Sequence, residues 1–237
     1  MRSIVVDYGE SMVKYSIDGK EYIGKRQRGL EEFIEWLIKK YYLVEEEVKF
    51  VLVVDIKEYV DTRKRLKVIE GGKYHLQIFP RLVGVVIENI DKLDEVCGVL
   101  EIGYDKVQYA MFRGGRVSRE SVLSIDYGIE VLLKEVGKVI EEKYHLEGDR
   151  ESLYSLLLNH SDTEMTRVFE VCKYQYLEGL RQEILKRNAG FDLVKNYVYG
   201  FESELLREQI NLRENFEYVS NTVYDGIRGV GKVMHLV

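Results

Sequence analysis

One pattern occurs twice in this chain: an apolar run ends at an acidic residue, and a glycine stands two positions later. The first copy is IVVDYG at residues 4–9, and the second is VCGVLEIG at residues 96–103. Each copy is followed by further short apolar runs, separated by turns, and then by a segment of helical periodicity. Residues 1–54 and 96–144 therefore predict the same order, β-β-β-α, and indicate an internal duplication of architecture.

Hydrophobic periodicity predicts the elements of both halves. In the first half we expect strands at 3–8 and 11–17, a third strand after the Asp18-Gly19 turn, a helix at 30–42, a buried strand at 48–54, a helix at 57–66, a hairpin of 67–69 with 74–79, and a short helix at 83–93. In the second half we expect strands at 96–104, 106–112, 117–122, 193–200 and 216–219, and helices at 127–144, 150–159, 161–186, 202–209 and 224–231.

The composition predicts a globular protein that stays in the cytoplasm. Hydrophobic residues make up 46% and charged residues 32% of the 237 residues. No apolar run approaches the ~20 residues that span a membrane, and the N-terminus lacks the pattern of a signal peptide. The net charge of −6 argues against direct nucleic-acid binding. Cys97 and Cys172 belong to no CxxC pattern, which favours reduced core residues over a zinc site.

The two acid-x-Gly turns allow two interpretations. Taken alone, each favours an ordinary hairpin. Each turn can also offer backbone N–H groups to a phosphate, because glycine lets the backbone approach closely. The carboxylate at the strand end can then hold Mg²⁺ directly or through water, and Lys14 can neutralise phosphate charge. The repetition within a repeated plan favours this second interpretation.

The order of short motifs along the chain resembles that of the actin-like ATPases, most closely the ParM and Alp branch. Residues 7–14 resemble the first phosphate loop, D-x-G-x-x-x-x-K, and residues 100–105 stand where the second loop, D-x-G-G-T-T, is expected. Residues 79–85 resemble the connection between the halves, and residues 126–132 the glycine-led helix. Residues 199–206 resemble the adenosine loop, and residues 221–229 the closing segment.

The resemblance implies an α/β fold of duplicated actin-like, ribonuclease H-like domains with a nucleotide cleft between them and reduced outer lobes. The first half would be residues 1–95, with a small inserted hairpin at about 62–80. The second would be residues 96–237, with a trimmed outer lobe and with about 216–237 returning to the first domain.

The resemblance also implies the ligands, ATP or GTP with Mg²⁺. Asp7 and Glu101 would be the catalytic residues and would hold the metal, directly or through water. The nucleotide would be bound by residues matched to the family's motifs: Asp7, Gly9, Glu10, Ser11, Lys14, Gly103, Tyr104, Asp105, Gly128, Gly200, Phe201 and Gly229.

Three departures from the family pattern favour nucleotide binding over fast hydrolysis. Glu101 replaces the aspartate of the second loop, and Tyr104-Asp105-Lys106 replaces Gly-Thr-Thr. Arg81 stands in the segment where relatives carry a water-orienting Glu or Gln.

The function implied is head-to-tail polymerisation into filaments for DNA or plasmid segregation or for intracellular positioning. A DNA-binding adaptor protein would be the partner, without membrane contact. A degenerate adaptor or scaffold without ATPase activity is the alternative. A small-molecule kinase of the same fold ranks third, because no substrate aspartate follows the second loop in a clear motif.

Overall fold

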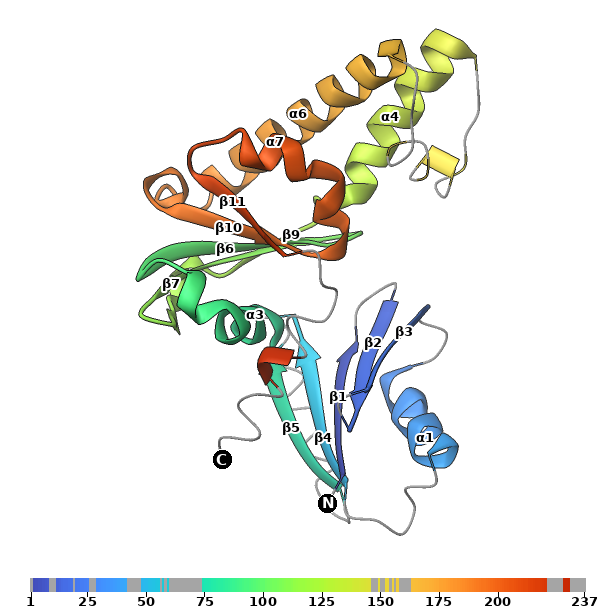
Figure 1. Cartoon of the computed structure of the whole chain (residues 1–237), viewed down its shortest axis with the longest axis vertical. Helices are drawn as coiled ribbons and strands as arrows, with labels where there is room; N and C mark the ends of the chain where they lie inside the picture. Colours follow the sequence, from blue (N-terminus) through green and yellow to red (C-terminus); the bar gives the residue numbers. More distant parts are fainter. Residues whose placement is uncertain are drawn as a thin grey trace. The chain divides into compact units, whose positions relative to one another are not determined.

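The chain forms two compact units in the computed structural model. One consists of Met1–Leu93 and Thr222–Val237, and the other of Asp94–Asn221 (Figure 1). The structure describes residues 2–8, 12–18, 20–25, 29–41, 48–55, 57, 59, 74–145, 149, 152, 153, 155, 157, 163–220 and 228–230.

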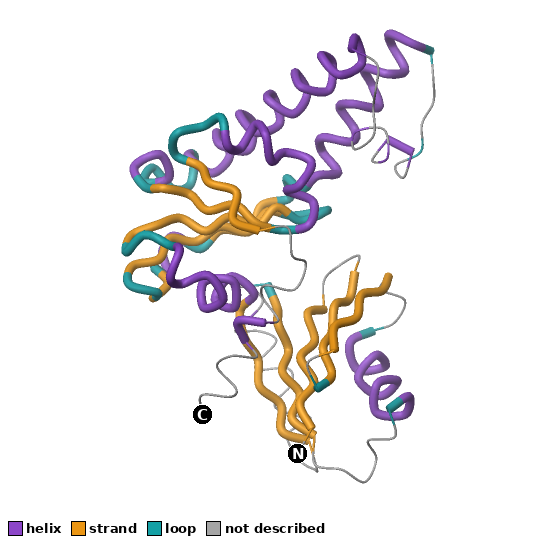
Figure 2. Tube along the Cα trace, viewed as in Figure 1, coloured by secondary structure: helices purple, strands orange, loops and turns teal. Residues whose placement is uncertain are grey.

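The first unit is built on a five-stranded sheet with the order β3-β2-β1-β4-β5. Its strands are β1 (Arg2–Tyr8), β2 (Met12–Ile17), β3 (Lys20–Lys25), β4 (Val48–Val54) and β5 (Tyr74–Pro80). The first three are antiparallel neighbours, whereas β4 and β5 run parallel to β1. Helix α1 (Leu30–Lys40) packs Phe33, Ile34 and Leu37 against one face of this sheet. Figure 2 shows the helix in purple beside the strands in orange.

Further helical segments belong to the first unit. Helix α3 (Arg81–Asn89) starts directly after Pro80, whose fixed φ of −69° suits a helix start. It continues into the 3₁₀ helix η2 (Ile90–Lys92). The short helical segment 228–230 buries Val230 with Val5, Val51 and Val53 on the sheet. Residues from the two ends of the sequence therefore share one core.

The second unit contains a six-stranded sheet in which β11-β10-β6-β7-β8 are neighbours and β9 pairs with β7. Its strands are β6 (Val96–Ile102), β7 (Val107–Arg113), β8 (Arg116–Val117), β9 (Leu123–Ile125), β10 (Lys195–Tyr199) and β11 (Phe216–Ser220). Strands β6, β10 and β11 are parallel, and β7 is antiparallel to β6.

Helices complete the second unit (Figure 1). They are η3 (Arg119–Ser121), α4 (Ile129–Tyr144), α6 (Thr163–Leu185), η4 (Phe191–Leu193), η5 (Phe201–Leu206) and α7 (Arg207–Asn211). The apolar stripe of α4, with Leu132, Leu133 and Val136, joins Phe169 and Leu180 of α6 in the core under the sheet. No helix in the described part of the chain has both the length and the apolar character needed to cross a bilayer.

The two sheets repeat one plan. In each, a first strand has an antiparallel neighbour on one side and two successive parallel strands on the other. By this criterion β6 corresponds to β1, β7 to β2, β10 to β4 and β11 to β5. The predicted duplicated α/β architecture is confirmed.

Several predicted elements need correction. Residues 74–79 were expected in an inserted hairpin, yet β5 is the edge strand of the main sheet, parallel to β4. The expected strand 117–122 is interrupted by η3, because Ser121 turns inward to bond Met111 N and Ser118 O. The expected helix 202–209 is a 3₁₀ turn, η5, followed by α7. Most of the expected helices 57–66, 150–159 and 224–231, and strand 67–69, lie outside the described residues.

Candidate functional site

Two buried carboxylates occupy equivalent places in the two sheets. Asp7 faces Lys14 on the antiparallel neighbour and Val53 on the parallel one. Glu101 faces Gln108 and Tyr199 in the same way. Both acids stand next to last in their strands, at the carboxyl ends of the parallel strands, which is where open α/β sheets bind ligands.

The carboxylate of Asp7 is bound by Arg81. Strand β5 ends two strands away from β1, and the guanidinium at the start of α3 reaches back across the end of β4. Its Nε and Nη2 donate to Asp7 Oδ1 at 2.9 and 2.7 Å. Asp7 is only 4% exposed. Removing one member of a buried ion pair typically lowers the free energy of unfolding by about 3–5 kcal/mol. The pair therefore stabilises the fold and also compensates the charge of the Asp7 carboxylate.

Lys14 adds a second cation at the same strand end. Its backbone lies opposite Asp7, and its side chain is partly exposed. It forms no ion pair with any residue in the described ranges. This ammonium group is therefore available to an anionic ligand. Gly9, Glu10 and Ser11, which were predicted to form the first loop, lie outside the described residues.

Glu101 accepts a hydrogen bond from a neutral side chain. Gln108 donates from Nε2 to Glu101 Oε2 at 2.6 Å, and both side chains are buried. Gln108 occupies the place that Lys14 has in the first sheet. The sequence analysis missed this residue, although the spacing of seven residues from Asp7 to Lys14 recurs from Glu101 to Gln108 and could have identified it.

The loop between β6 and β7 is anchored on the start of α4. The amides of Ile129, Glu130 and Gly128 each donate at 3.0 Å to the carbonyls of Gly103, Tyr104 and Asp105, respectively. In a trans peptide the C=O and the following N–H point in opposite directions. The amide groups of residues 104–106 are thus directed away from the helix, which is the orientation that a phosphate-binding loop requires.

Gly128 has a packing role in this arrangement. A Cβ at this position would lie 2.2 Å from the carbonyl oxygen of Tyr104. The amide of Gly128 is bonded to Asp105 O, so the residue stabilises the loop from the side that faces α4. Gly128 was predicted to contact the nucleotide. In the structure it lies next to the loop, at the N-terminus of α4, and its amide is bonded to the loop.

Gly200 lies at the adjacent strand end. It follows Tyr199, which faces Glu101, and has φ of 114°. A Cβ there would be 2.5 Å from Ile102 O. Glycine is required both for this backbone conformation and for the close approach to β6. Phe201 begins η5, and its side chain lies outside the described residues.

Gly229 belongs to the first unit, where it is buried against α3. A Cβ at Gly229 would lie 1.7 Å from Gly84 O. Glu101, Gly103, Tyr104, Asp105, Gly128 and Gly200 are brought together in the second unit, whereas Asp7 and Lys14 lie together in the first.

The predicted metal ligands do not fit a magnesium site. Asp7 is paired with a guanidinium and Glu101 is bonded by an amide. Mg²⁺ demands near-octahedral oxygen ligation and is usually anchored by carboxylates. No three His, Cys, Asp or Glu side chains gather as a metal site among the described residues.

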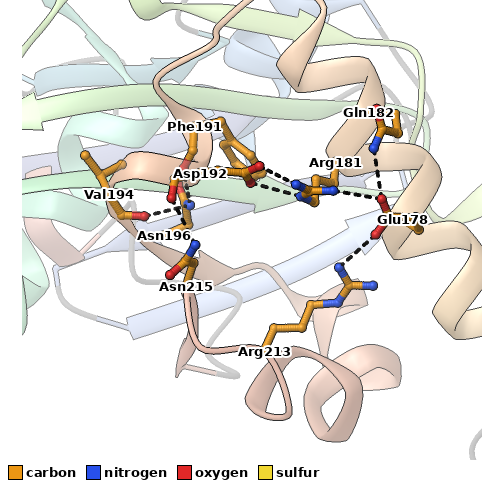
Figure 3. Close-up of polar contacts among 9 residues, drawn as sticks. All are labelled: Glu178, Arg181, Gln182, Phe191, Asp192, Val194, Asn196, Arg213 and Asn215. Carbon is orange, nitrogen blue, oxygen red and sulfur yellow. Dashed lines mark hydrogen bonds and ion pairs between the residues drawn. The ribbon is translucent and has the colours of Figure 1, made fainter.

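A second polar cluster, on α6, has a structural role (Figure 3). Arg181 donates from Nε to Asp192 Oδ1 at 2.9 Å and from Nη1 to Glu178 Oε1 at 2.9 Å. Hydrogen bonds from Gln182, and then from Arg181 and Arg213, lower the pKa of Glu178. The acids and guanidinium groups are matched, and the cluster joins α6 to η4 and to the turn before β11.

No protein-family model matches the sequence, and no curated protein matches it. The solved structures that match over the whole chain share one architecture, the actin-like fold. An archaeal actin homologue, Ta0583, matches with a TM-score of 0.80 at 11% identity, over 100% of this chain and 99% of that chain.

Two further matches have the same extent. The Alp12 filament structure has a TM-score of 0.72 at 16% identity, over 99% of this chain and 98% of that chain. MreB5 of Spiroplasma citri bound to ADP has a TM-score of 0.72 at 11% identity, over 99% and 96%. Likeness at these identities establishes the fold, so the predicted fold class and the resemblance to actin-like proteins are confirmed at that level.

Proposed function

We propose that this protein binds ATP or GTP and assembles head-to-tail into filaments. The observation that carries the proposal is the loop of residues 103–106. The carbonyls of residues 103–105 are bonded to amides at the start of α4, and the amides of residues 104–106 are directed away from it. Successive backbone amides held in this way form an anion-binding concavity. In the first unit, Lys14 offers an ammonium group of its own at the strand end.

The fold gives independent support. Ta0583 has been solved as a complex with ADP, MreB5 has been solved bound to ADP, and Alp12 has been solved as a filament. A head-to-tail interface that does not close generates a filament. We propose DNA or plasmid segregation, through an adaptor protein, or intracellular positioning as the cellular role.

Hydrolysis in this proposal is slow. Water attack on a γ-phosphate depends on positioning and on stabilisation of charge. Glu101 stands at the end of β6, directly before this loop, and its Oε2 already accepts the Gln108 amide at 2.6 Å. This bond also supports the second candidate function, a filament scaffold or adaptor without ATPase activity.

Sedimentation with and without nucleotide, with phosphate release followed in the same samples, tests the proposal. Lys14→Ala removes the cation at the ligand end of β2, and Lys49→Ala is the matched control, because Lys49 lies near the opposite, amino end of β4 in the same sheet. We expect nucleotide-dependent pelleting that is lost in Lys14→Ala and retained in Lys49→Ala.

The alternative outcomes separate the candidates. Pelleting that needs no nucleotide, without phosphate release, favours the scaffold. Absence of pelleting in every condition contradicts filament formation. Equal behaviour of the two lysine variants contradicts the assignment of Lys14 to phosphate.

A further inference from the structure

The buried pair of Asp7 and Arg81 places a cation of the protein itself at the end of β1, where the resemblance implies Mg²⁺. The resemblance assigns Asp7 to Mg²⁺, but its Oδ1 accepts two donors from Arg81, at 2.7 and 2.9 Å. The Asp7 side chain is 5% and the Arg81 side chain 15% exposed. A guanidinium remains protonated throughout the pH range in which proteins fold. The guanidinium therefore supplies a permanent positive charge at this strand end and compensates the Asp7 carboxylate without a metal.

We infer that Arg81 takes the place of the divalent cation at this strand end, so that the protein binds its nucleotide without requiring Mg²⁺. The inference rests on the nucleotide binding proposed above. The charge is built into the fold: Arg81 is the first residue of α3, and Pro80 fixes the backbone before it. The cation is thus in position before any ligand arrives.

Electrostatics disfavours a metal at the same place. A divalent ion would meet a carboxylate whose charge is already compensated, and it would be repelled by the guanidinium. Mg²⁺ gives up its water reluctantly and needs strong anionic anchors to be held by protein. Replacing the arginine by the ion would also leave a mostly buried guanidinium without its carboxylate, which is costly.

At the second strand end, the acid that the resemblance assigns to the metal is bonded within the chain. Glu101 is buried, and Gln108 donates to it across the hairpin at 2.6 Å. Within the described ranges, no three His, Cys, Asp or Glu side chains form a grouping that could hold a metal. The two acids that the resemblance assigns to the metal are therefore both held by side chains of this chain.

The test is a titration of the full-length protein with a fluorescent ATP analogue, in excess MgCl₂ and in excess EDTA. We expect the wild-type affinities in the two buffers to agree within about threefold. Arg81→Gln keeps an amide donor for Asp7 and removes the charge. We expect this variant to bind about tenfold more weakly in EDTA, with recovery in MgCl₂.

Arg228→Gln is the matched control. Arg228 also forms a two-pronged ion pair in the first unit, with Glu21 at 2.6 and 2.9 Å. Glu21 belongs to β3, two strands away from β1, and therefore does not take part in the pair of Asp7 and Arg81. Its Mg²⁺ dependence should equal that of the wild type.

Two further variants keep the test decisive if Arg81→Gln does not fold. Arg81→Lys retains the charge and should remain independent of Mg²⁺. The double variant Asp7→Asn/Arg81→Gln retains a neutral hydrogen-bonded pair and should require Mg²⁺. Wild-type binding that depends on Mg²⁺ overturns the inference and leaves the proposed function intact, whereas the absence of binding in both buffers overturns both.

Discussion

At the scale of single residues, the two strand-end acids differ in what holds them. Asp7 is held by a charge that comes from 74 residues further along the chain, and Glu101 by an amide seven residues away. The local partner could be predicted from hairpin spacing alone. The distant partner could not, because it depends on β5 lying in the main sheet next to β4.

Glycine shows the same limit of sequence reasoning. Motif matching selected Gly128, Gly200 and Gly229 as ligand contacts. The structure gives each a close backbone approach within its own unit. A glycine indicates that some other atom approaches the backbone closely at that position. A single sequence does not tell whether that atom belongs to a ligand or to another part of the chain.

Replacing Gly128 distinguishes these two roles. Gly128→Ala should lower the free energy of unfolding by about 1–3 kcal/mol, since its Cβ would overlap the Tyr104 carbonyl. Gly24→Ala is the control, because a Cβ at Gly24 meets no atom within 4 Å. Urea unfolding measures both. A fully stable Gly128→Ala protein that has lost nucleotide binding would show instead that the glycine contacts ligand.

Buried thiol and phenol groups make stability depend on alkaline pH. Burial, and then the charge of Asp94, raise the pKa of the Cys97 thiol to about 11. Burial likewise raises the pKa of Tyr109 and Tyr176. A raised folded-state pKa gives stability that is complete below the unfolded pKa and is lost as the pH rises towards the folded pKa.

We therefore expect stability to fall as the pH rises above about 8.5, where the thiol of an unfolded chain ionises. Urea midpoints at a series of pH values between neutrality and about 9, below the ordinary pKa of tyrosine, report the buried thiols Cys97 and Cys172, because burial raises the pKa of both. Cys97→Val should reduce the slope over that interval. An identical slope in both proteins would assign the loss to other groups.

At the scale of elements, hydrophobic periodicity was sufficient wherever a strand or helix is long. Strands β1, β4 and β6 and helices α1, α4 and α6 were predicted to within a few residues at each end. Errors occurred where a short tertiary contact overrides the pattern. Ser121 breaks the third strand of the second unit, and the tight backbone at Gly200 starts η5 as a 3₁₀ turn.

The charged cluster on α6 should contribute measurable stability. Arg181→Ala removes the links to Asp192 and Glu178, and we expect a loss of about 1 kcal/mol, since the side chains are 27–36% exposed and partly screened. The loss should shrink at high salt. Lys138→Ala, which breaks a more exposed pair with Glu135, should leave urea unfolding unchanged. Equal losses in the two variants would contradict a role for the network.

At the scale of the whole molecule, the second unit is one continuous stretch of sequence and the first is not. Residues 94–221 contain a complete sheet, its covering helices and an unbroken core. We expect this fragment to unfold cooperatively in urea when it is produced alone. Residues 1–93 alone lack Val230, which is buried with Val5, Val51 and Val53, and should be less stable than the same unit in the full chain. A fragment 94–221 without a cooperative transition would contradict this expectation.

The placement of Gly229 and Val230 has a consequence for synthesis on the ribosome. Chains emerge from the N-terminus onward, and domains generally fold as units. The second unit is complete once Asn221 has emerged, whereas the first, although its strands appear earliest, waits for residues 228–230 to cover Val5, Val51 and Val53. The unit that is translated first is therefore the one completed last, and its open sheet face is the surface that a nascent-chain chaperone would encounter.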